Sequence, residues 1–280
     1  MIDCFLNMMD KKLFIMGAPN AGKSTFLAAL WHSVNQKDVR TDLTLERMAG
    51  NVNYLQGIEK KWLEVDKLGR TVIGQEQENL TILLAKEDMK LELEFPDLSG
   101  ETFRDMYDKR EISNKLKQKI ENADSILYFV NVSDIHTAEL ISEIDPKYRS
   151  EGQRQNERKA SEDDPTQVQM IDLLQAILDI KKDVKLAIIF SAWDLVDSIE
   201  HDNVDLYLKK HMNMLWQYLH ANKNVYHTKL WGVSALGGKI DESEKLLDIE
   251  EPIKRIEIIN DKREKSCDLT SIILEMSGEL

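Results

Sequence analysis

The string GAPNAGKST, residues 17–25, constrains the fold of this chain more than any other segment. It satisfies the pattern GxxxxGK[ST] and lies where a short aliphatic run, residues 12–16, gives way to helical spacing. Its glycines let the backbone curl into a concave row of N–H donors, and the following helix adds the positive end of its dipole. The string therefore predicts a strand, a phosphate-binding loop and a helix in succession.

Further short aliphatic runs alternate with longer segments of helical spacing, which is typical of a parallel sheet with crossover helices. We predict an α/β fold of the P-loop NTPase class, with a mostly parallel six-stranded sheet flanked by helices. The expected strands are residues 12–16, 80–85, 91–95, 125–130, 185–190 and 225–233. The expected helices are residues 23–35, 105–122, 166–181, 203–222 and 250–265, with a short one after Asp268.

Two segments read as insertions in a single elaborated domain that spans residues 1–280. Apolar residues between Leu45 and Val65 recur at intervals of three or four, which predicts an inserted amphipathic helix over about 43–68. Gly50 and Gly57 argue against that helix. The segment at about 145–165 is rich in charge and has almost nothing to bury, so we expect a mobile surface insertion there.

Composition excludes several classes of function. The 50 acidic and 37 basic residues give a net charge of −13, which argues against broad nucleic-acid binding. The two cysteines, Cys4 and Cys267, form no metal-binding pattern and no disulfide framework. The sequence contains no run of about 18 apolar residues, so we expect a cytoplasmic protein with no membrane contact.

Within the predicted phosphate loop, each polar side chain has a chemical role to fill. The Lys23 ammonium can reach the β and γ phosphates, and the Ser24 hydroxyl can coordinate the Mg²⁺ bound between them. The residues expected to contact nucleotide in this loop are Gly17, Asn20, Ala21, Gly22, Lys23, Ser24 and Thr25.

Two further strings follow predicted strands. DLSGE, residues 97–101, is a DxxG motif in which Asp97 can hold the Mg²⁺ shell and the Gly100 N–H can meet the γ phosphate. FSAWD, residues 190–194, ends in a carboxylate, Asp194, that can accept both the N1–H and the amino group of guanine. Adenine would leave that carboxylate unpaired, which is costly.

These motifs, in this order, resemble the TRAFAC class of P-loop GTPases, which includes Ras-like and Era-like G domains. FPDLSGETF and the long insertion before the second strand most resemble bacterial double-GTPase proteins, which are associated with conflict or defence systems. The resemblance implies that Ser234, Ala235 and Leu236 correspond to the SAK string, whose backbone N–H meets guanine O6. It also implies guanine nucleotide and Mg²⁺ as ligands.

The chain departs from the family pattern where guanine is read. Ala192 stands in place of the lysine that packs on the base, and Ser191 in place of the asparagine that ties this loop to the phosphate loop. These changes leave base selectivity open. Trp193 could cover the base or pack in the core, and we count it as a candidate base contact.

The residues around the γ phosphate are also predicted from the resemblance. Glu101 takes the place of the water-orienting glutamine, although it could instead be a surface glutamate. Thr71 is our choice for the switch I threonine that binds Mg²⁺, with Thr41 and Thr44 as rivals, and Arg70 is a candidate arginine finger in cis. Asn20 resembles an asparagine that helps bind K⁺ in Era-like proteins, so K⁺ is a candidate cofactor.

The leading hypothesis is a GTP-hydrolysing switch with slow turnover that acts on a protein partner: a second GTPase, an effector or an activating protein. One alternative is a module that binds GTP but hardly hydrolyses it, because a glutamate occupies the catalytic position. Another is an ATP-using P-loop ATPase or kinase, because SAWD is degenerate. A degenerate fold that binds no nucleotide is the last possibility.

Overall fold

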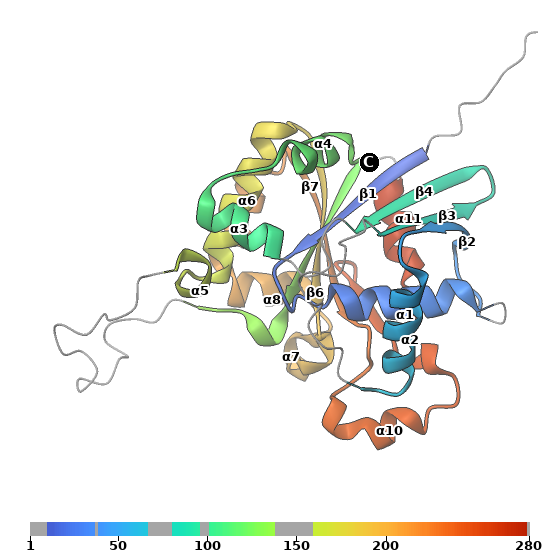
Figure 1. Ribbon diagram of the computed structural model, residues 1–280. Helices are drawn as coiled ribbons and strands as arrows, with labels where there is room; N and C mark the ends of the chain where they lie inside the picture. Colours follow the sequence, from blue (N-terminus) through green and yellow to red (C-terminus); the bar gives the residue numbers. More distant parts are fainter. Residues whose placement is uncertain (1–9, 37–38, 67–79, 96–100, 138–158, 279–280) are drawn as a thin grey trace, which may run out of the picture.

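The computed structural model describes residues 10–36, 39–66, 80–95, 101–137 and 159–278. In this part of the chain, one nine-stranded sheet runs through the centre of the molecule and helices cover both of its faces (Figure 1). The α/β fold with a parallel core is as predicted, but the six predicted strands are joined by three more.

The strands occur in the order β2-β3-β4-β1-β5-β6-β7-β8-β9 across the sheet. The central strands β4, β1, β5, β6 and β7 are parallel, and the pairings at both margins are antiparallel. Their bounds are β1 Asp10–Gly17, β2 Thr44–Ala49, β3 Leu80–Lys86, β4 Met89–Phe95, β5 Ser125–Asn131, β6 Val184–Ser191, β7 Tyr226–Ser234, β8 Glu257–Asn260 and β9 Lys265–Ser266.

The helices divide between the two faces of the sheet. One face carries α1 Lys23–Asn35, α2 Val52–Leu63 and α11 Thr270–Ser277, and the other carries α3 Glu101–Lys109, α4 Asn114–Asn122, α6 Thr166–Ile180, α8 Val204–His211 and α9 Asn213–Ala221. Shorter helices are α5 Ala160–Asp163, α7 Ser198–His201 and α10 Ser243–Leu247. Single 3₁₀ turns lie at Val132–Asp134, Trp193–Leu195, Ile240–Glu242 and Pro252–Arg255.

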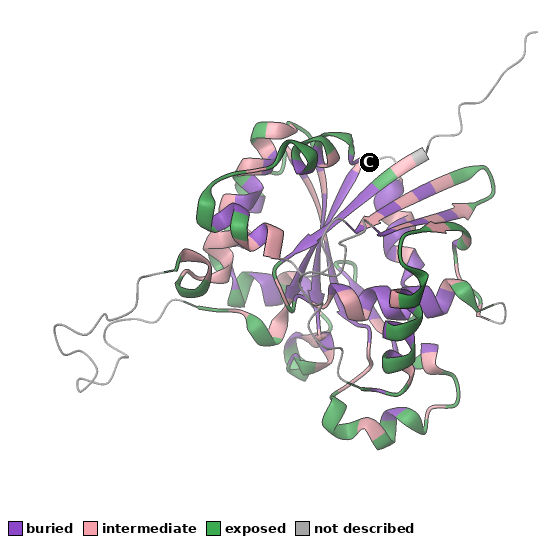
Figure 2. Cartoon of the chain, viewed as in Figure 1, coloured by how far each residue is buried: buried purple, intermediate pink, exposed green. Residues whose placement is uncertain are grey.

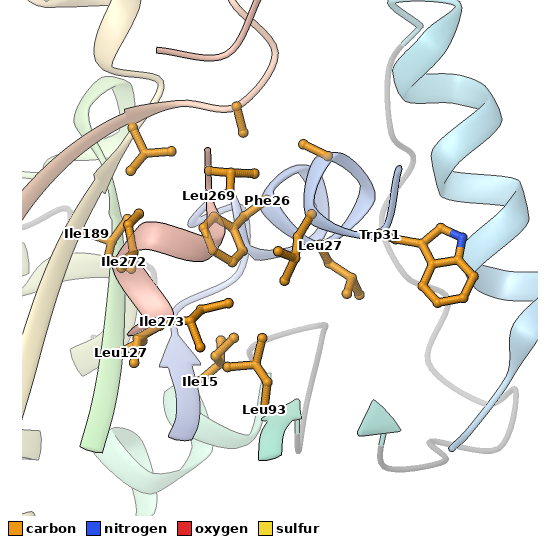
Figure 3. Close-up of a cluster of buried hydrophobic side chains, with 14 of the residues drawn as sticks. Ile15, Phe26, Leu27, Trp31, Leu93, Leu127, Ile189, Leu269, Ile272 and Ile273 are labelled. Carbon is orange, nitrogen blue, oxygen red and sulfur yellow. The ribbon is translucent and has the colours of Figure 1, made fainter. Parts of the chain in front are cut away.

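Two apolar cores form because successive strand residues point to opposite faces. In β1, Leu13 and Ile15 join the core under α1 and α11, whereas Phe14 and Met16 join the core on the other face. Figure 2 shows the central strands buried along most of their length and the outer helix faces exposed. In the first core, Ile272 and Ile273 of α11 pack with Phe26 of α1 (Figure 3).

The helix predicted over 43–68 is wrong in its first half. Residues 44–49 form β2, which pairs antiparallel with β3, and α2 begins only after Gly50. A register shift between Leu45 and Arg47 breaks the strict alternation of the strand. Leu45 and Met48 can therefore both pack against the same core although they are three residues apart, and this spacing imitated a helix.

The helix predicted over 250–265 is also wrong. Residues 257–260 form β8, which pairs with the edge of β7, and β9 follows after a turn. Ile258 and Ile259 lie in the cores on opposite faces of the sheet, which is strand and not helix geometry. The exposed edge of β7 decided this pairing, and a local pattern cannot report it.

The other expected helices are present, two of them divided. The 105–122 segment forms α3 and α4, and the 203–222 segment forms α8 and α9. The predicted charged insertion falls largely outside the described residues, and its last part forms α5. Among the helices described here, none combines the length and the apolar character needed to cross a membrane.

Candidate functional site

The predicted phosphate loop joins β1 to α1 at the edge of the sheet where the parallel strands end. β5, β6 and β7 end at the same edge, because they run parallel to β1. In open α/β sheets, the carboxyl ends of the strands form the crevice in which ligands bind. Most of the sequence-predicted site residues that the structure describes therefore gather in one place.

The two glycines of the loop are required by its geometry. Gly17 has φ +149° and a Cβ there would lie 2.7 Å from the Phe129 carbonyl oxygen on β5. Gly22 has φ +88° and a Cβ there would lie 2.5 Å from Ser191 Oγ on β6. Asn20, at the turn between them, is also left-handed with φ +61°. The backbone of the loop therefore lies in direct contact with the ends of β5 and β6.

Lys23 is the first residue of α1, and its ammonium turns back over the loop. Its Nζ donates to the carbonyl oxygens of Gly17, at 2.7 Å, and Ala18, at 2.8 Å. The residue is only 3% exposed, and these two hydrogen bonds hold its ammonium at the loop. Ser24 and Thr25 follow in the first turn of α1 and are partly buried.

Two side chains from other strands fix the loop from outside. Ser191 Oγ donates to the Ala21 carbonyl at 2.9 Å, and Asn131 Nδ2 donates to the Asn20 carbonyl at 3.0 Å. Ser191, which stands in place of the asparagine that the resemblance expects to tie this loop to the phosphate loop, makes a tie of its own through its hydroxyl. Sequence analysis missed Asn131, whose only signal was its place at the end of a strand.

The SAWD string and the 234–237 loop meet through one hydrogen bond. Ser234 Oγ donates to Asp194 Oδ1 at 2.5 Å and accepts from the Gly237 N–H at 3.2 Å. Asp194 is partly buried, Ala235 is buried and Leu236 is half-buried. The Ala235 carbonyl accepts a hydrogen bond from Trp62 Nε1 at 2.8 Å.

Trp193 lies in the core, which corrects its assignment as a base contact. Its side chain is fully buried, its Nε1 donates to the His201 carbonyl at 2.9 Å, and its ring packs edge-on against Tyr207. Gly232 of β7 accommodates the indole, because a Cβ there would lie 2.3 Å from the Trp193 ring. The ring is therefore enclosed in the core beneath the SAWD turn and has no exposed surface to present to a base.

Glu101 begins α3 and is paired within that helix. Its Oε1 lies 2.9 Å from Nη2 of Arg104, one turn later, and both side chains are about one third exposed. Arg104 also lines a cavity of about 390 Å³ between the phosphate loop, α3 and α6. Sequence analysis missed this arginine, although its spacing from Glu101 is that of an ion pair on a helix.

Four predicted site residues, Arg70, Thr71, Asp97 and Gly100, lie outside the described residues. The rival threonines are described and lie near the β2 edge. Thr41 Oγ1 donates to the Leu43 carbonyl at 2.6 Å, and Thr44 Oγ1 donates to the Ala85 carbonyl at 3.2 Å.

Where residues are described, no group of three or more His, Cys, Asp or Glu side chains could hold a metal. The Ser24 hydroxyl, on the first turn of α1 beside the loop, instead suits a metal that is bound mainly by a nucleotide and takes a single ligand from this turn. Mg²⁺ at a nucleotide keeps water and phosphate ligands and needs only one or two from protein. The donor set at the loop therefore fits a nucleotide-bound Mg²⁺ rather than a metal site made by protein alone.

A family model described as Double-GTPase 1 matches residues 14–276. Among solved structures, the protein described as nucleolar GTP-binding protein 1 from Plasmodium falciparum is similar at 14% identity, with 86% of each chain covered and a TM-score of 0.39. The G domain of the T. maritima FeoB iron transporter is similar at 16% identity, over 86% of this chain and 97% of that one, with a TM-score of 0.31. At these TM-scores, neither likeness assigns a role to any residue. No curated protein gives a significant match.

Proposed function

The chain belongs to the Double-GTPase 1 family, and from this we propose that it binds GTP and hydrolyses it to GDP with Mg²⁺, as a nucleotide-dependent switch. The observation that carries the proposal is the Ser234–Asp194 hydrogen bond. It joins the two candidate guanine-reading strings at the sheet edge that also holds the phosphate loop. A phosphate site and a base site then share one crevice.

In the phosphate part of the site, the residues bind the phosphate oxygens and neutralise their negative charge. The left-handed Gly22 is the N-cap residue immediately before α1, so that the N–H groups of the first helical turn face the loop. Lys23 is already held at the loop by two carbonyls, which limits the side-chain entropy lost when phosphate oxygens replace them. We assign Ser24 as a ligand of Mg²⁺. Asp97 and Thr71, which lie outside the described residues, are assigned to the same ion.

On the base side, Asp194 is the proposed reader of guanine. One of its oxygens accepts from Ser234, which fixes the orientation of the carboxylate. A carboxylate so held has oxygen lone pairs left to accept the two N–H donors that guanine presents side by side. Adenine offers no such pair of donors, and the resulting unpaired carboxylate is the proposed source of selectivity.

For hydrolysis, we assign Glu101 to orienting the attacking water. A carboxylate close to the γ phosphate would repel it, and the Arg104 guanidinium at 2.9 Å offsets that charge. Bound Mg²⁺ would supply further positive charge at the phosphates. Arg70 as an arginine finger and Asn20 as a K⁺ ligand stay predictions.

The first test compares displacement of a fluorescent nucleotide by GTP, GDP, ATP and ADP in the presence of Mg²⁺. We expect guanine nucleotides to displace at concentrations at least about tenfold lower, which corresponds to about 1.4 kcal/mol. Equal or better displacement by ATP would refute guanine reading.

The Asp194→Asn variant sharpens this test. An amide offers one acceptor and one donor, so the variant should lose GDP affinity and gain affinity for xanthosine diphosphate, which presents the matching acceptor at C2. Asp197→Asn, an exposed carboxylate three residues later, is the matched control and should bind as the wild type does. Retained GDP preference in the Asp194 variant would remove this residue from base reading.

A second candidate function is GTP binding with negligible hydrolysis. The Glu101–Arg104 ion pair favours it, because a carboxylate oxygen held by a guanidinium is less available to accept a hydrogen bond from the attacking water. Single-turnover hydrolysis of GTP by Glu101→Ala separates the two functions. We expect a rate loss on the order of 100-fold at unchanged GTP affinity if Glu101 orients water, with Asp105→Ala on the same helix as control. A wild-type rate no higher than that of GTP in buffer alone would favour the binding module, and an equal, measurable rate in the variant and the wild type would remove Glu101 from water orientation.

A further inference from the structure

The inserted helix α2 reaches the candidate base site through one buried side chain. Trp62, in its last turn, is fully buried, and its Nε1 donates to the Ala235 carbonyl at 2.8 Å. The two residues are 173 positions apart. A segment expected from the sequence to be an elaboration of the fold therefore contacts the 234–237 loop directly.

This hydrogen bond fixes more than one carbonyl. The Ala235 carbonyl and the Leu236 N–H belong to the same peptide unit, which is planar and trans. They point in opposite directions, so a donor that holds the carbonyl also sets the direction of the N–H. Trp62 thereby determines where the Leu236 N–H points, within the loop whose N–H groups we assign to guanine O6.

Trp62 is itself held from several sides. The Arg255 guanidinium lies 4.6 Å from the centre of its ring and donates to the Trp62 carbonyl at 3.1 Å. The centre of the His32 ring lies 5.2 Å from the centre of the Trp62 ring. All the hydrogen bonds that the structure shows for Arg255 have backbone carbonyls as acceptors. Two of these carbonyls, those of Trp62 and Leu63, lie at the C-terminal end of α2, and the dipole of a helix favours a cation at that end.

Arg255 also contacts the 234–237 loop through its backbone. A Cβ at Gly237, where φ is +90°, would lie 2.3 Å from the Arg255 carbonyl oxygen. The loop, the turn that contains Arg255 and the end of α2 therefore pack as one unit. Within this unit the indole N–H has a fixed position.

A hydrogen bond is not a general property of buried tryptophans here. Among the described residues, Nε1 of Trp31 and Nε1 of Trp231 are buried without a partner. Trp31 is on α1 and its ring faces α2 (Figure 3). Trp31 thus offers a tryptophan of similar burial near the same helix that makes no hydrogen bond to the 234–237 loop.

We propose that Trp62 is a positioning residue for base recognition: it orients the Ala235–Leu236 peptide so that its N–H selects an oxygen acceptor at C6 of the purine. The proposal rests on the proposed guanine binding. It makes α2 part of the specificity of the site, with no contact between Trp62 and the nucleotide.

The test compares Trp62→Phe with Trp31→Phe and the wild type, using displacement by GDP, ADP and 6-thio-GDP. The thio analogue replaces O6 with sulfur, which accepts hydrogen bonds weakly. In Trp62→Phe we expect the preference for GDP over 6-thio-GDP and over ADP to fall by about threefold to tenfold, which is the range for one lost hydrogen bond. Trp31→Phe should keep the wild-type ratios.

If the role of Trp62 were purely structural, the substitution would weaken the binding of all three nucleotides alike. Unchanged affinity ratios between GDP, 6-thio-GDP and ADP would therefore overturn the proposal. If Trp62→Phe does not fold, 3-benzothienylalanine at position 62 keeps the shape of the indole and replaces the N–H with sulfur, and the same ratios decide. If the wild type shows no preference for GDP over ADP, the proposed guanine binding fails first. If the wild type prefers GDP and Trp62→Phe shows the same affinity ratios, the role of Trp62 is refuted and the proposed guanine binding stands.

Discussion

Gly22→Ala is the substitution that most directly tests how the phosphate loop is built. Gly22 has φ +88°, and a left-handed conformation costs a residue with a Cβ about 1 to 2 kcal/mol. The new Cβ would also lie 2.5 Å from Ser191 Oγ and 2.6 Å from Ser191 Cβ. Because β6 is paired on both sides by β5 and β7, the strand cannot move away.

Overpacking of this kind costs about 1 to 3 kcal/mol. Adding the conformational cost, we expect Gly22→Ala to lower the free energy of unfolding by about 2 to 5 kcal/mol. The measurement is urea denaturation without nucleotide, in which the midpoint should fall and the slope should stay constant. Gly57→Ala is the matched control: Gly57 is in α2 with nothing within 4 Å of its added Cβ, and the change should stabilise by up to about 1 kcal/mol.

A double-mutant cycle separates the overlap from the backbone strain. Ser191→Gly removes both atoms that the new Cβ meets, so the double variant should be more stable than the sum of the single effects by about 1 to 3 kcal/mol. Strict additivity would show that the two residues do not press on each other. A Gly22→Ala variant within about 1 kcal/mol of the wild type would refute the strain and overlap together.

Two further predictions concern the support of the SAWD turn. Trp193→Phe removes a buried hydrogen bond and part of the ring, and thermal denaturation should show a loss of about 1 to 3 kcal/mol with the GDP to ADP affinity ratio unchanged. The Lys210 ammonium, and then the His211 ring, hold the pKa of Glu200 below its ordinary value. Stability from this group is therefore present above the ordinary glutamate pKa and is lost as pH falls through the lowered one. The stability difference between wild type and Glu200→Gln should vanish in that acidic range, and a constant difference across pH would contradict it.

Sequence patterns within a few residues were sufficient to predict some of the helices and strands. The α1 helix begins at Lys23 and ends at Asn35 as expected, because a left-handed glycine marks its start and apolar spacing marks its length. The runs in β5 and β6 were recognised as strands because burial on both faces requires continuous apolar residues.

The errors occur where a distant partner chose the structure. β2 and β8 are strands because β3 and β7 had edges to pair with, and their irregular apolar spacing resembled a helix. Trp193 could be assigned to base or core only when Gly232 and Tyr207 were placed around it.

The sequence by itself determined the phosphate loop, the sheet class and the order of the motifs, because each depends on neighbours within a few residues. Only the tertiary structure decided how those motifs are fixed: Ser191 to Ala21, Asp194 to Ser234 and Trp62 to Ala235. These bonds join residues between 40 and 173 positions apart. Their formation depends on the register of parallel strands and the docking of α2, which are set by the burial of the two cores and not by any local pattern.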